Sequence, residues 1–548
     1  MQLRTAFFAA MSKQKIHHLL LKAEKARGQK NFPECKRLCQ AVLKQDSSEM
    51  AAAEIWGLCA LETGQFFEAI EPAQLLMDHE PQNPNGAMIA SVALMNTGQD
   101  EVAIQVLEHQ LEKSPEVLGL WFNLHSAYSA VGNAQKSLEI AIKAVSLAPT
   151  NADAYNNLGA SLHACARNKD AVIAFQTAVD LNPRQFTARL NLANSLSDDD
   201  ARVIQEIEYV LKEGGDSLNE RARVGGLHNS AFAYLRTGHL RIGWERLEYG
   251  FSPLIESNRG RKPRRNFDQP RWRGEPLAGR RLLVWREQGI GDEIMFATML
   301  HELENLDGTI ILECEPRLVD VFQRCFPKFQ VRSELYRAVY PFDSAHKDFD
   351  LQIPIGSLAG IYRNEIADFD RAKPYWIVDP ALSNQYAQRL AQEAPGKRWV
   401  GLCWRSAIVS PTRSTSYTLL ADWLELLRHP DVVVVNLQYG QCEAELAAME
   451  SELGIRILRW DDTNLQDDFS ALSAIIANLH CVCSVGTTVA QVAGAVGAKT
   501  FLVATSYNWT SFGTNRYPFH RSIDLIISND KEDIRQAVDV AIEKATRA

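Results

Sequence analysis

The sequence predicts two architectures in one chain, an all-α superhelix of repeated helix pairs followed by an α/β region with parallel strands. Three observations favour this class. Proline and glycine recur every 34 residues in the first third of the 548-residue chain, an arginine-rich segment ends this period, and short apolar runs then alternate with amphipathic ones. Helix pairs and alternating strands and helices need separate cores, and the length also indicates at least two domains.

Composition narrows the class of protein. Hydrophobic residues make up 46% and charged residues 23% of the chain, as in ordinary globular proteins. The formal net charge of −9 does not favour binding to nucleic acid or insertion into a membrane. The ten cysteines include no CxxC pair, which indicates free thiols in a reducing compartment. No apolar run reaches about 18 residues, so we expect no spanning helix and a cytoplasmic protein.

Three series of residues, called ladders below, recur at intervals of 34 positions and define a repeat. The prolines are Pro81, Pro115, Pro149 and Pro183, the glycines are Gly64, Gly98 and Gly132, and the small residues are Ala69, Ala103, Ser137 and Ala171. A unit of two helices, with a glycine turn between them and a proline after them, explains all three. Each helix pair exposes an apolar face that only its neighbours cover, so we expect the units to stack around a concave groove.

The repeats are expected to begin near residues 16, 50, 84, 118, 152 and 186, and a decayed unit at 224–250 completes an array at 16–250. The unit Ala152–Gln185 most clearly resembles the tetratricopeptide repeat. The residues that match that family's pattern are Tyr155, Leu158, Gly159, Ala171, Ala178 and Pro183. Grooves of such arrays typically hold a peptide or protein, and a purely architectural spacer is the alternative.

Four asparagines lie on first helices of the repeats, at or beside the position that faces the groove. They are Asn123, Asn156, Asn157 and Asn191. Their side-chain amides are candidates to bind the main chain of an extended acceptor peptide. Simple exposure at the surface is the alternative interpretation.

A basic segment at 251–281 separates the array from the rest of the chain. Its cationic residues are Arg259, Arg261, Lys262, Arg264, Arg265, Arg271, Arg273, Arg280 and Arg281. Between residues 258 and 281, little periodicity and three prolines favour a solvated linker. The alternative is a positive rim that attracts an acidic acceptor or a phosphorylated donor. The only aromatic residues between 258 and 281 are Trp272 and Phe267, so this stretch does not resemble a nucleic-acid groove.

Beyond the linker, two strand–turn–helix units are candidates for a ligand site. The strand at 281–285 leads into Gly289, Gly291 and Asp292, and a later strand at 481–485 leads into Gly486, Thr487 and Thr488 at the start of a helix. Ligands of parallel sheets bind outside the carboxyl ends of the strands, and a helix N-terminus favours a diphosphate. A glycine needed only for the turn, an aspartate cap and a threonine cap are the alternatives.

Five segments together resemble bacterial glycosyltransferases that carry tetratricopeptide repeats, relatives of the ADP-heptose heptosyltransferases and, more distantly, of the O-linked N-acetylglucosamine transferases. The segments are 285–296, 349–358, 401–405, 436–440 and 486–497. The resemblance implies a GT-B fold, with two Rossmann-like halves at 282–394 and 395–548 that face a cleft. It also implies that the second half holds most of the nucleotide sugar.

The resemblance further implies roles for individual residues. Asp292 is the expected base that takes the proton of the acceptor hydroxyl. Thr487 and Thr488 would hold the diphosphate, with Arg413 or Arg405 as a cationic partner. Gln438 and its neighbour Tyr439 would lie beside the base or ribose of the nucleotide. The donor-binding residues expected on this basis are Gly289, Gly291, Trp404, Arg405, Arg413, Gln438, Gly486, Thr487, Thr488 and Gln491.

We therefore expect an inverting glycosyltransferase that moves a sugar from a nucleotide-sugar donor to a protein acceptor recruited by the array, with flagellin as an acceptor that the resemblance suggests. The resemblance implies no bound metal and no cofactor other than the donor, so the Asp-Phe-Asp runs at 348–350 and 368–370 are read as turn and strand-edge carboxylates. The alternative is a non-enzymatic peptide-binding adaptor with a degenerate GT-B domain. Gln491, where the family usually has His, and Gly486, where it often has Asp, favour the adaptor.

Overall fold

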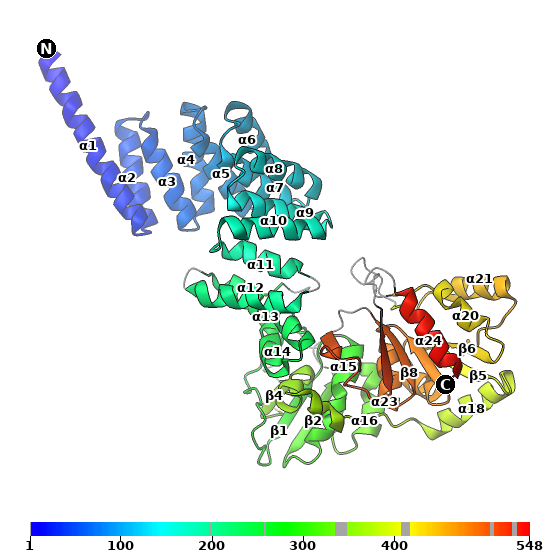
Figure 1. Ribbon diagram of the computed structural model, residues 1–548. Coiled ribbons are helices and arrows are strands. Elements are labelled where there is room, and N and C mark those ends of the chain that lie inside the picture. Colours follow the sequence, from blue (N-terminus) through cyan, green and yellow to red (C-terminus); the bar gives the residue numbers. More distant parts are fainter. Residues whose placement is uncertain are drawn as a thin grey trace. The chain divides into compact units, whose positions relative to one another are not determined.

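A computed structural model describes residues 2–196, 199–215, 218–256, 259–334, 348–406, 417–504, 509–528 and 534–547, with side chains from residue 13 onward (Figure 1). Contacts divide the chain into two compact units. The first contains residues 1–196 and 206–218, and the second contains residues 197–205 and 219–548. Helix pairs make up the first unit, and the second contains all the strands in the described part of the chain.

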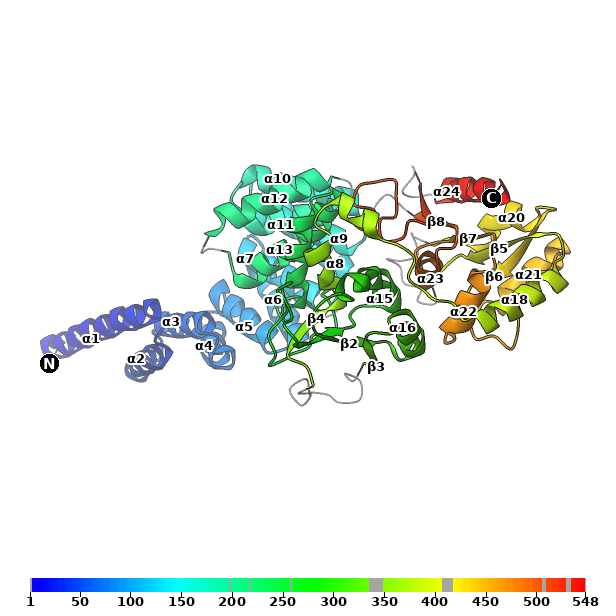
Figure 2. The same cartoon turned by 90° about the horizontal axis from the view of Figure 1, so that it is seen from below.

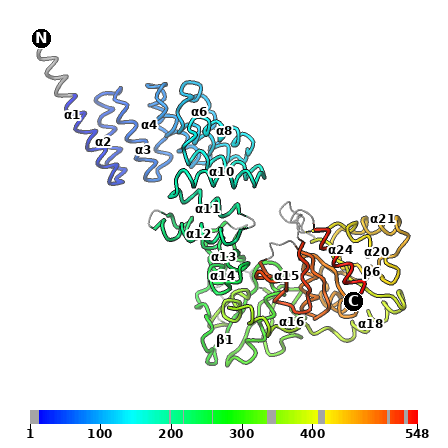
Figure 3. Tube along the Cα trace, viewed as in Figure 1, coloured from blue at the N-terminus to red at the C-terminus, as the bar shows by residue number. Residues whose placement is uncertain are grey.

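The helices of the first unit follow one another as pairs, and Figures 1 and 3 show α2 to α10 stacked in chain order. They are α1 (Gln2–Gly28), α2 (Phe32–Gln45), α3 (Met50–Glu62), α4 (Phe66–His79), α5 (Pro84–Asn96), α6 (Asp100–Lys113), α7 (Leu118–Ala130), α8 (Ala134–Leu147), α9 (Ala152–Ala164), α10 (Asn168–Leu181), α11 (Phe186–Ser195) and α12 (Asp200–Glu213). First helices also contact first helices, because α3 packs on α5, α5 on α7 and α7 on α9. The predicted stack of helix pairs is confirmed.

The turn inside each pair explains the glycine ladder. Gly64, Gly98 and Gly132 have φ of 72°, 75° and 73°, which is left-handed backbone that glycine adopts without strain. The same position is held by Lys30 in the first pair, with φ 54°, and by Ala166 in the fifth, with φ 59°. Geometry therefore repeats every 34 residues even where the residue type does not, and the ladder in the sequence reports a backbone requirement.

A chain of hydroxyls, buried at Ser137 and Ser161, runs through the middle of the array. The Nε2 atom of His125 lies 2.9 Å from the Ser161 hydroxyl, which lies 2.8 Å from the Ser137 hydroxyl, and Ser137 lies 2.9 Å from that of Ser129. His125 is buried, and this burial lowers its pKa below the ordinary 6.5. The imidazole is therefore neutral in the folded array.

The array is expected to lose stability as the pH falls below 6.5, because unfolding releases His125 to take up a proton that the folded state rejects. Hydrogen exchange of peptides from α7 to α9 at pH 7.5 and pH 5.0 measures this effect as protection factors, which correct each rate for the intrinsic rate at that pH. The variant His125→Gln keeps an amide near Ser161 and should show a smaller fall in protection factor on acidification. Equal falls in wild type and variant would contradict the assignment to His125.

The first sheet of the second unit contains β1 (Arg281–Trp285), β2 (Thr309–Cys314), β3 (Gln330–Ser333) and β4 (Leu351–Pro354). Its strand order is β3-β2-β1-β4, and every pair is parallel. The helices connected to it are α15 (Ile290–Phe296), α16 (Val319–Cys325) and α17 (Ala359–Tyr362). Elements from β1 to residue 371 are called the first half below.

The second sheet contains β5 (Arg398–Cys403), β6 (Val432–Asn436), β7 (Cys481–Ser484), β8 (Thr500–Ala504) and β9 (Ile523–Ile527) in the order β6-β5-β7-β8-β9, again all parallel. Its helices are α18 (Pro380–Glu393), α20 (Leu424–Leu427), α21 (Glu443–Leu453), α22 (Phe469–Ile476), α23 (Thr488–Val496) and α24 (Arg535–Arg547). Figure 2 shows α20 and α24 on one side of this sheet and α18 and α22 on the other. Elements from residue 380 onward are called the second half.

Parallel sheets were predicted for this region, and both are present. Strands β7 and β8 are buried along their whole length, and β1, β2 and β5 along most of it, as expected where both faces of a sheet are covered. The near-continuous apolar runs in the sequence, such as 432–435, are thus explained by their position in the sheets.

The basic segment is not a solvated linker, which corrects the interpretation drawn from its composition. Arg261 is 3% exposed and pairs with Glu287 and Glu248, and Arg265 lies 2.5 Å from Glu313. Arg271 pairs with Glu248, and the chain beside it bonds to β4 through Gln352. The segment folds onto the first half, where glutamates neutralise these arginines.

The last helix pair is also placed differently from the prediction. Helices α13 (Glu220–Arg236) and α14 (Leu240–Leu247) keep the repeat turn, because Gly238 has φ 79°. They belong, however, to the unit that contains the sheets. The Trp244 indole donates to the Arg363 carbonyl at 2.6 Å, and its ring packs edge-on against Trp509 and Phe512. The apolar face of this pair is covered by the sheet unit.

Candidate functional site

In each sheet, successive strands are added on one side of the first strand and then on its other side. Strand β1 lies between β2 and β4, and β5 lies between β6 and β7. In open parallel sheets, ligands bind outside the carboxyl ends of the strands at this kind of point. The turn at 286–292 follows β1, residues 404–406 follow β5, and the turn at 485–487 follows β7. The turns singled out in the sequence therefore occupy the positions where such sheets bind ligands.

The turn after β1 and the turn after β7 face each other across the two halves. A Cβ atom built on Gly291 would lie 3.4 Å from the Thr488 hydroxyl and 3.7 Å from Cγ of Gln491. Helices α15 and α23, which begin at these turns, pack on each other. Residues about 200 positions apart are thus brought close to van der Waals distance.

Asp292 serves as the cap of its own helix. Its Oδ2 atom accepts a hydrogen bond from the Gly289 N–H at 3.1 Å, and the side chain is half-buried. Gln288 has φ 59°, and its N–H donates to the Lys262 carbonyl at 2.6 Å. The cap that the sequence left open as an alternative is therefore present. Because a carboxylate has two oxygens, capping through Oδ2 does not preclude proton transfer at the other.

The turn before α23 combines an exposed glycine with two threonines. Gly486 is exposed, Thr488 is half-buried and Thr487 is buried. Thr487 holds the N-cap position, but its hydroxyl lies 3.0 Å from Ser484 and makes no capping bond. The first N–H groups of a helix have no partners inside the helix, and the helix dipole makes this end positive. The turn can therefore accept an anion beside Thr488.

Gln438 makes structural hydrogen bonds at the ends of two strands. It is 1% exposed, and its side-chain oxygen accepts from the Arg405 N–H at 3.0 Å while its side-chain N–H donates to the Tyr439 carbonyl at 3.0 Å. The Cys403 thiol lies 3.7 Å from this oxygen and 3.5 Å from the Thr487 hydroxyl. Gln438 thus joins the ends of β5 and β6, and it also lines the cavity described below.

Two further residues predicted to bind the donor face α21. Trp404 is 1% exposed, lies in the core and donates its indole N–H to Glu445 at 3.1 Å. Arg405 pairs with the other oxygen of Glu445 at 2.8 Å and donates to the Gln441 carbonyl at 3.3 Å. The direct contact with a donor that was predicted for the Trp404 side chain is not compatible with its burial. Arg413 lies outside the described residues.

Gln491 points at the first half. Its side-chain N–H donates to the Tyr517 hydroxyl at 2.6 Å, and that hydroxyl lies 3.3 Å from the Met295 sulfur on α15. Complete burial raises the pKa of Tyr517 to about 12, so its hydroxyl stays neutral. The Oε1 atom of Gln491 is buried without a hydrogen-bond partner in the described part of the chain. This residue therefore joins the two halves close to Gly291.

A cavity of about 530 Å³ lies in the second half at the carboxyl end of β6. It is lined by residues 436, 438–443, 459–461, 463–466 and 475. The side-chain oxygen of Gln438, a lining residue, lies 3.7 Å from the Cys403 thiol, and the Thr487 hydroxyl lies 3.5 Å from the same thiol. The cavity and the threonine turn are therefore adjacent.

The chemistry of the cavity suits a flat polar ring. Trp460 and Tyr439 supply aromatic surface, and Gln441, Asn464 and Gln466 supply amides. Arg459 in its wall is paired within the protein, because it lies 2.9 Å from both Glu443 and Glu450. The segment 459–466 was not predicted. Its only signal in the sequence is a tryptophan within a polar stretch between a strand and a helix.

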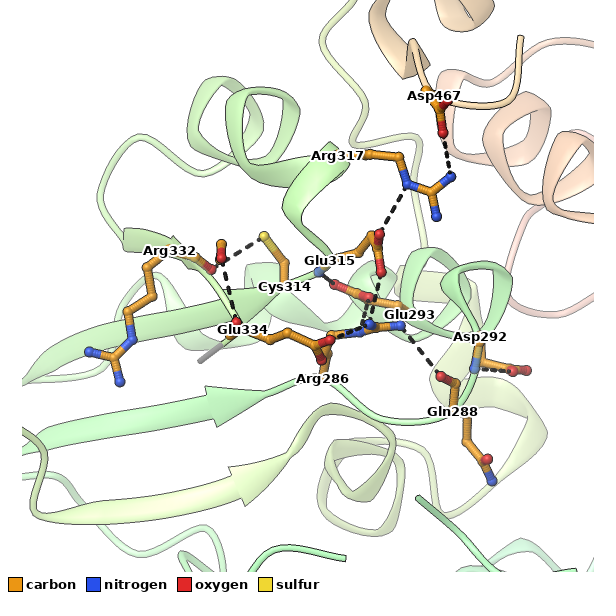
Figure 4. Close-up of polar contacts among 12 residues, drawn as sticks. Arg286, Gln288, Asp292, Glu293, Cys314, Glu315, Arg317, Arg332, Glu334 and Asp467 are labelled. Carbon is orange, nitrogen blue, oxygen red and sulfur yellow. Dashed lines mark hydrogen bonds and ion pairs between the residues drawn. The ribbon is translucent and has the colours of Figure 1, made fainter. Parts of the chain in front are cut away.

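A buried cluster of charges supports the turn that carries Asp292 (Figure 4). Arg286 lies 2.9 Å from Glu293, 2.8 Å from Glu315 and 3.1 Å from Glu334. Arg286, Glu315 and Glu334 directly follow strands β1, β2 and β3, and Glu293 follows Asp292 on α15. Burial raises the pKa of Glu293 to about 7, and Arg286 opposes this effect. The cluster was not predicted.

The array asparagines make hydrogen bonds between repeats. Asn123 donates to the Ser91 hydroxyl at 3.0 Å, and Asn191 donates to the side-chain oxygen of Asn156 at 2.9 Å. These three and Asn157 are half-buried, which contradicts simple exposure. A peptide that binds their amides would compete with these bonds.

The carboxylates of the two Asp-Phe-Asp runs have structural partners. Asp350 lies 2.9 Å from Arg281 and Asp348 pairs with Arg332, while Asp368 accepts the N–H groups of Asn364 and Glu365 at 2.9 and 3.0 Å. These contacts are of the kind expected for turn and strand-edge carboxylates at Asp348, Asp350 and Asp368. Within the described ranges, no group of three or more His, Cys, Asp or Glu is arranged to hold a metal ion.

The ten cysteines are all free, as predicted. Among the described helices, none combines the length and the apolar character that crossing a bilayer requires.

Comparison with known proteins supports the repeats. The tetratricopeptide repeat family model matches residues 152–185, the unit that the ladders selected. Protein FlbA of Caulobacter vibrioides is 29% identical over 463 residues, which are 82% of this chain and 70% of FlbA.

Two crystal structures are similar to parts of the chain. TTC0263, a thermophilic TPR protein in Thermus thermophilus, is 18% identical with a TM-score of 0.29 and covers 33% of this chain and 98% of its own. YrrB, described as a TPR protein with an unusual peptide-binding site, is 18% identical with a TM-score of 0.28 and covers 33% and 95%. Residues 152–185 thus belong to a tetratricopeptide repeat, and such repeats typically mediate contacts between proteins.

Proposed function

We propose that this protein is an inverting glycosyltransferase of the GT-B type, which moves a sugar from a nucleotide donor to a protein acceptor. The observation that carries the proposal is the order in space of three features that lie next to one another. A 530 Å³ cavity with aromatic and amide walls adjoins the Thr488 turn, and this turn lies against the turn that carries Asp292. A nucleotide sugar has the same order, a planar base, a phosphate group and a reacting sugar carbon.

Each part has a chemical role in this proposal. The base occupies the cavity, and the phosphate accepts N–H bonds at the start of α23 beside Thr488. The acceptor hydroxyl attacks the anomeric carbon, Asp292 takes its proton, and the bond from that carbon to the phosphate oxygen breaks with its electrons on the leaving group. The positive end of α23 stabilises the charge that develops there. Attack opposite the leaving group inverts the configuration. The repeat array would recruit the acceptor, for which flagellin stays a suggestion of the resemblance.

Nucleotide binding tests the proposal without knowledge of the sugar or the acceptor. Activated sugars carry ADP, GDP, UDP, dTDP or CMP as leaving groups, and we expect calorimetry to detect one of them at or below millimolar concentration. Thr488→Ala should weaken its binding by roughly 10- to 150-fold, since a hydrogen bond to a charged group contributes about 1.5–3 kcal/mol. The control Thr177→Ala, on α10 of the array, should leave binding unchanged. Absence of binding for all five nucleotides would leave the adaptor as the better function.

A further inference from the structure

One side chain joins the cavity of the second half to the buried charges of the first. Arg317 stands in the short 3-10 helix Pro316–Leu318 just beyond the end of β2. Its Nη1 donates to the Gln466 carbonyl at 2.9 Å and to Asp467 at 3.1 Å, while its Nε donates to Glu315 at 3.0 Å. Figure 4 shows Arg317 between Glu315 and Asp467. Gln466 lines the cavity, so the guanidinium contacts its wall directly.

At its other end this contact leads to the turn that carries Asp292. Glu315 lies 2.8 Å from Arg286, and its N–H donates to Glu293 at 2.9 Å. Arg286 also pairs with Glu293, which follows Asp292, and its guanidinium lies 3.4 Å from the Gln288 carbonyl. Three neighbouring ion pairs therefore connect the cavity wall to the residues on both sides of the proposed base.

The charges make this connection sensitive to the position of the wall. Arg286 faces three buried carboxylates, and among them Glu315 is the one that Arg317 also contacts. A shift of segment 464–467 that moves Arg317 would weaken or strengthen its ion pair with Glu315, and this would change the attraction between Glu315 and Arg286. Because Arg286 and Glu293 flank the turn, such a change reaches Gln288 and Asp292. A guanidinium suits this role since it offers several donors in a fixed plane.

We propose that Arg317 is a positioning residue that couples occupancy of the cavity to the conformation of the Gln288–Asp292 turn. The occupant rests on the proposed function, a nucleotide whose base contacts segment 459–466. Its binding orders that segment, Gln466 and Asp467 then hold Arg317, and Glu315 and Arg286 transmit the restraint to the turn. The donor thereby prepares the base before the sugar is transferred.

Hydrogen exchange with mass spectrometry tests the coupling on the full chain. The probe is whichever of ADP, GDP, UDP, dTDP and CMP binds the wild type. We expect it to slow exchange both in peptides covering 459–467 and in peptides covering 286–296. In Arg317→Gln the probe should still bind within threefold and protect 459–467, but at least two thirds of the protection at 286–296 should be lost.

Two variants and a control separate coupling from stability. Arg317→Lys keeps the charge but not the planar fork, so it should lose the protection at 286–296 as Arg317→Gln does. Asp467→Asn weakens the bridge on the cavity side without touching the buried cluster, and it replaces Arg317→Gln if that variant unfolds. Arg324→Gln, on neighbouring α16, removes an arginine whose guanidinium bonds to the Ile377 carbonyl, outside the cluster, and should behave as wild type.

The outcomes are distinct. Protection at 286–296 that is absent in wild type, or that persists in Arg317→Gln and Arg317→Lys, overturns the coupling while the proposed function stands. Absence of binding by any of the five nucleotides removes both.

Discussion

Asp292→Asn is expected to slow sugar transfer by roughly 100- to 10,000-fold, the usual contribution of a general base. The amide cannot take the proton of the acceptor hydroxyl. Its oxygen can still accept the Gly289 N–H, so the start of α15 should remain intact. Nucleotide affinity should therefore stay within threefold of wild type. Turnover of the donor with acceptor protein, together with calorimetry on the same preparations, measures both quantities.

Another acidic residue of the first half provides the control for Asp292. Asp320→Asn, at the start of α16, also removes one negative charge from the first half and should leave transfer unchanged. If Asp292→Asn retains the wild-type rate, another group is the base. If it loses nucleotide affinity as well as rate, the residue supports the fold of the site and its role in proton transfer is not supported.

Arg286→Leu is expected to destabilise the sheet unit by about 3–5 kcal/mol, because it removes the cation shared by three buried carboxylates. In a unit of this size such a loss corresponds to a fall in Tm on the order of 10 °C. Circular dichroism during heating measures it. An unchanged Tm would show that the charged side chains of the cluster are exposed to water in solution and are not buried.

Removal of the Glu293 carboxylate from the same cluster should change how the stability of the protein depends on pH. Burial raises the pKa of Glu293 from 4.5 to about 7, with Arg286, Glu315 and Glu334 facing it. The folded state therefore keeps a proton that the unfolded state loses above pH 4.5, and stability falls as the pH rises from 4.5 through 7. Glu293→Gln should remove this fall, so its Tm relative to wild type should increase between pH 5 and pH 8. A constant difference in Tm would contradict the raised pKa.

Local patterns predicted the elements well because their causes are local. The glycine ladder follows from a left-handed turn in each pair, and the apolar runs follow from strands covered on both faces. The basic segment was misinterpreted because composition reports charge but not partners. The glutamates that neutralise Arg261 and Arg265 lie 26 and 48 positions further along the chain, at Glu287 and Glu313, within or just after apolar strands.

The candidate site was predictable in part for the same reason. The turns at Gly289 and Thr487 follow strands and carry local signals, and the resemblance implied that they face each other. The wall at 459–466 has no period that marks it, and the contacts of Arg317 with Gln466 join residues 149 positions apart. The resemblance implied that Gln438 lies beside the base or ribose, and this residue lines the cavity while its amide bonds to groups just after β5 and β6.

Transfer of a sugar to protein is the central claim, and mass spectrometry tests it most directly. Intact masses of soluble and surface proteins are compared between cells that produce the wild-type chain and cells that produce Asp292→Asn at equal levels. Our account predicts that at least one protein is heavier in the wild-type cells by the mass of one or more whole sugar residues. Identical masses for all proteins in the two strains would contradict it.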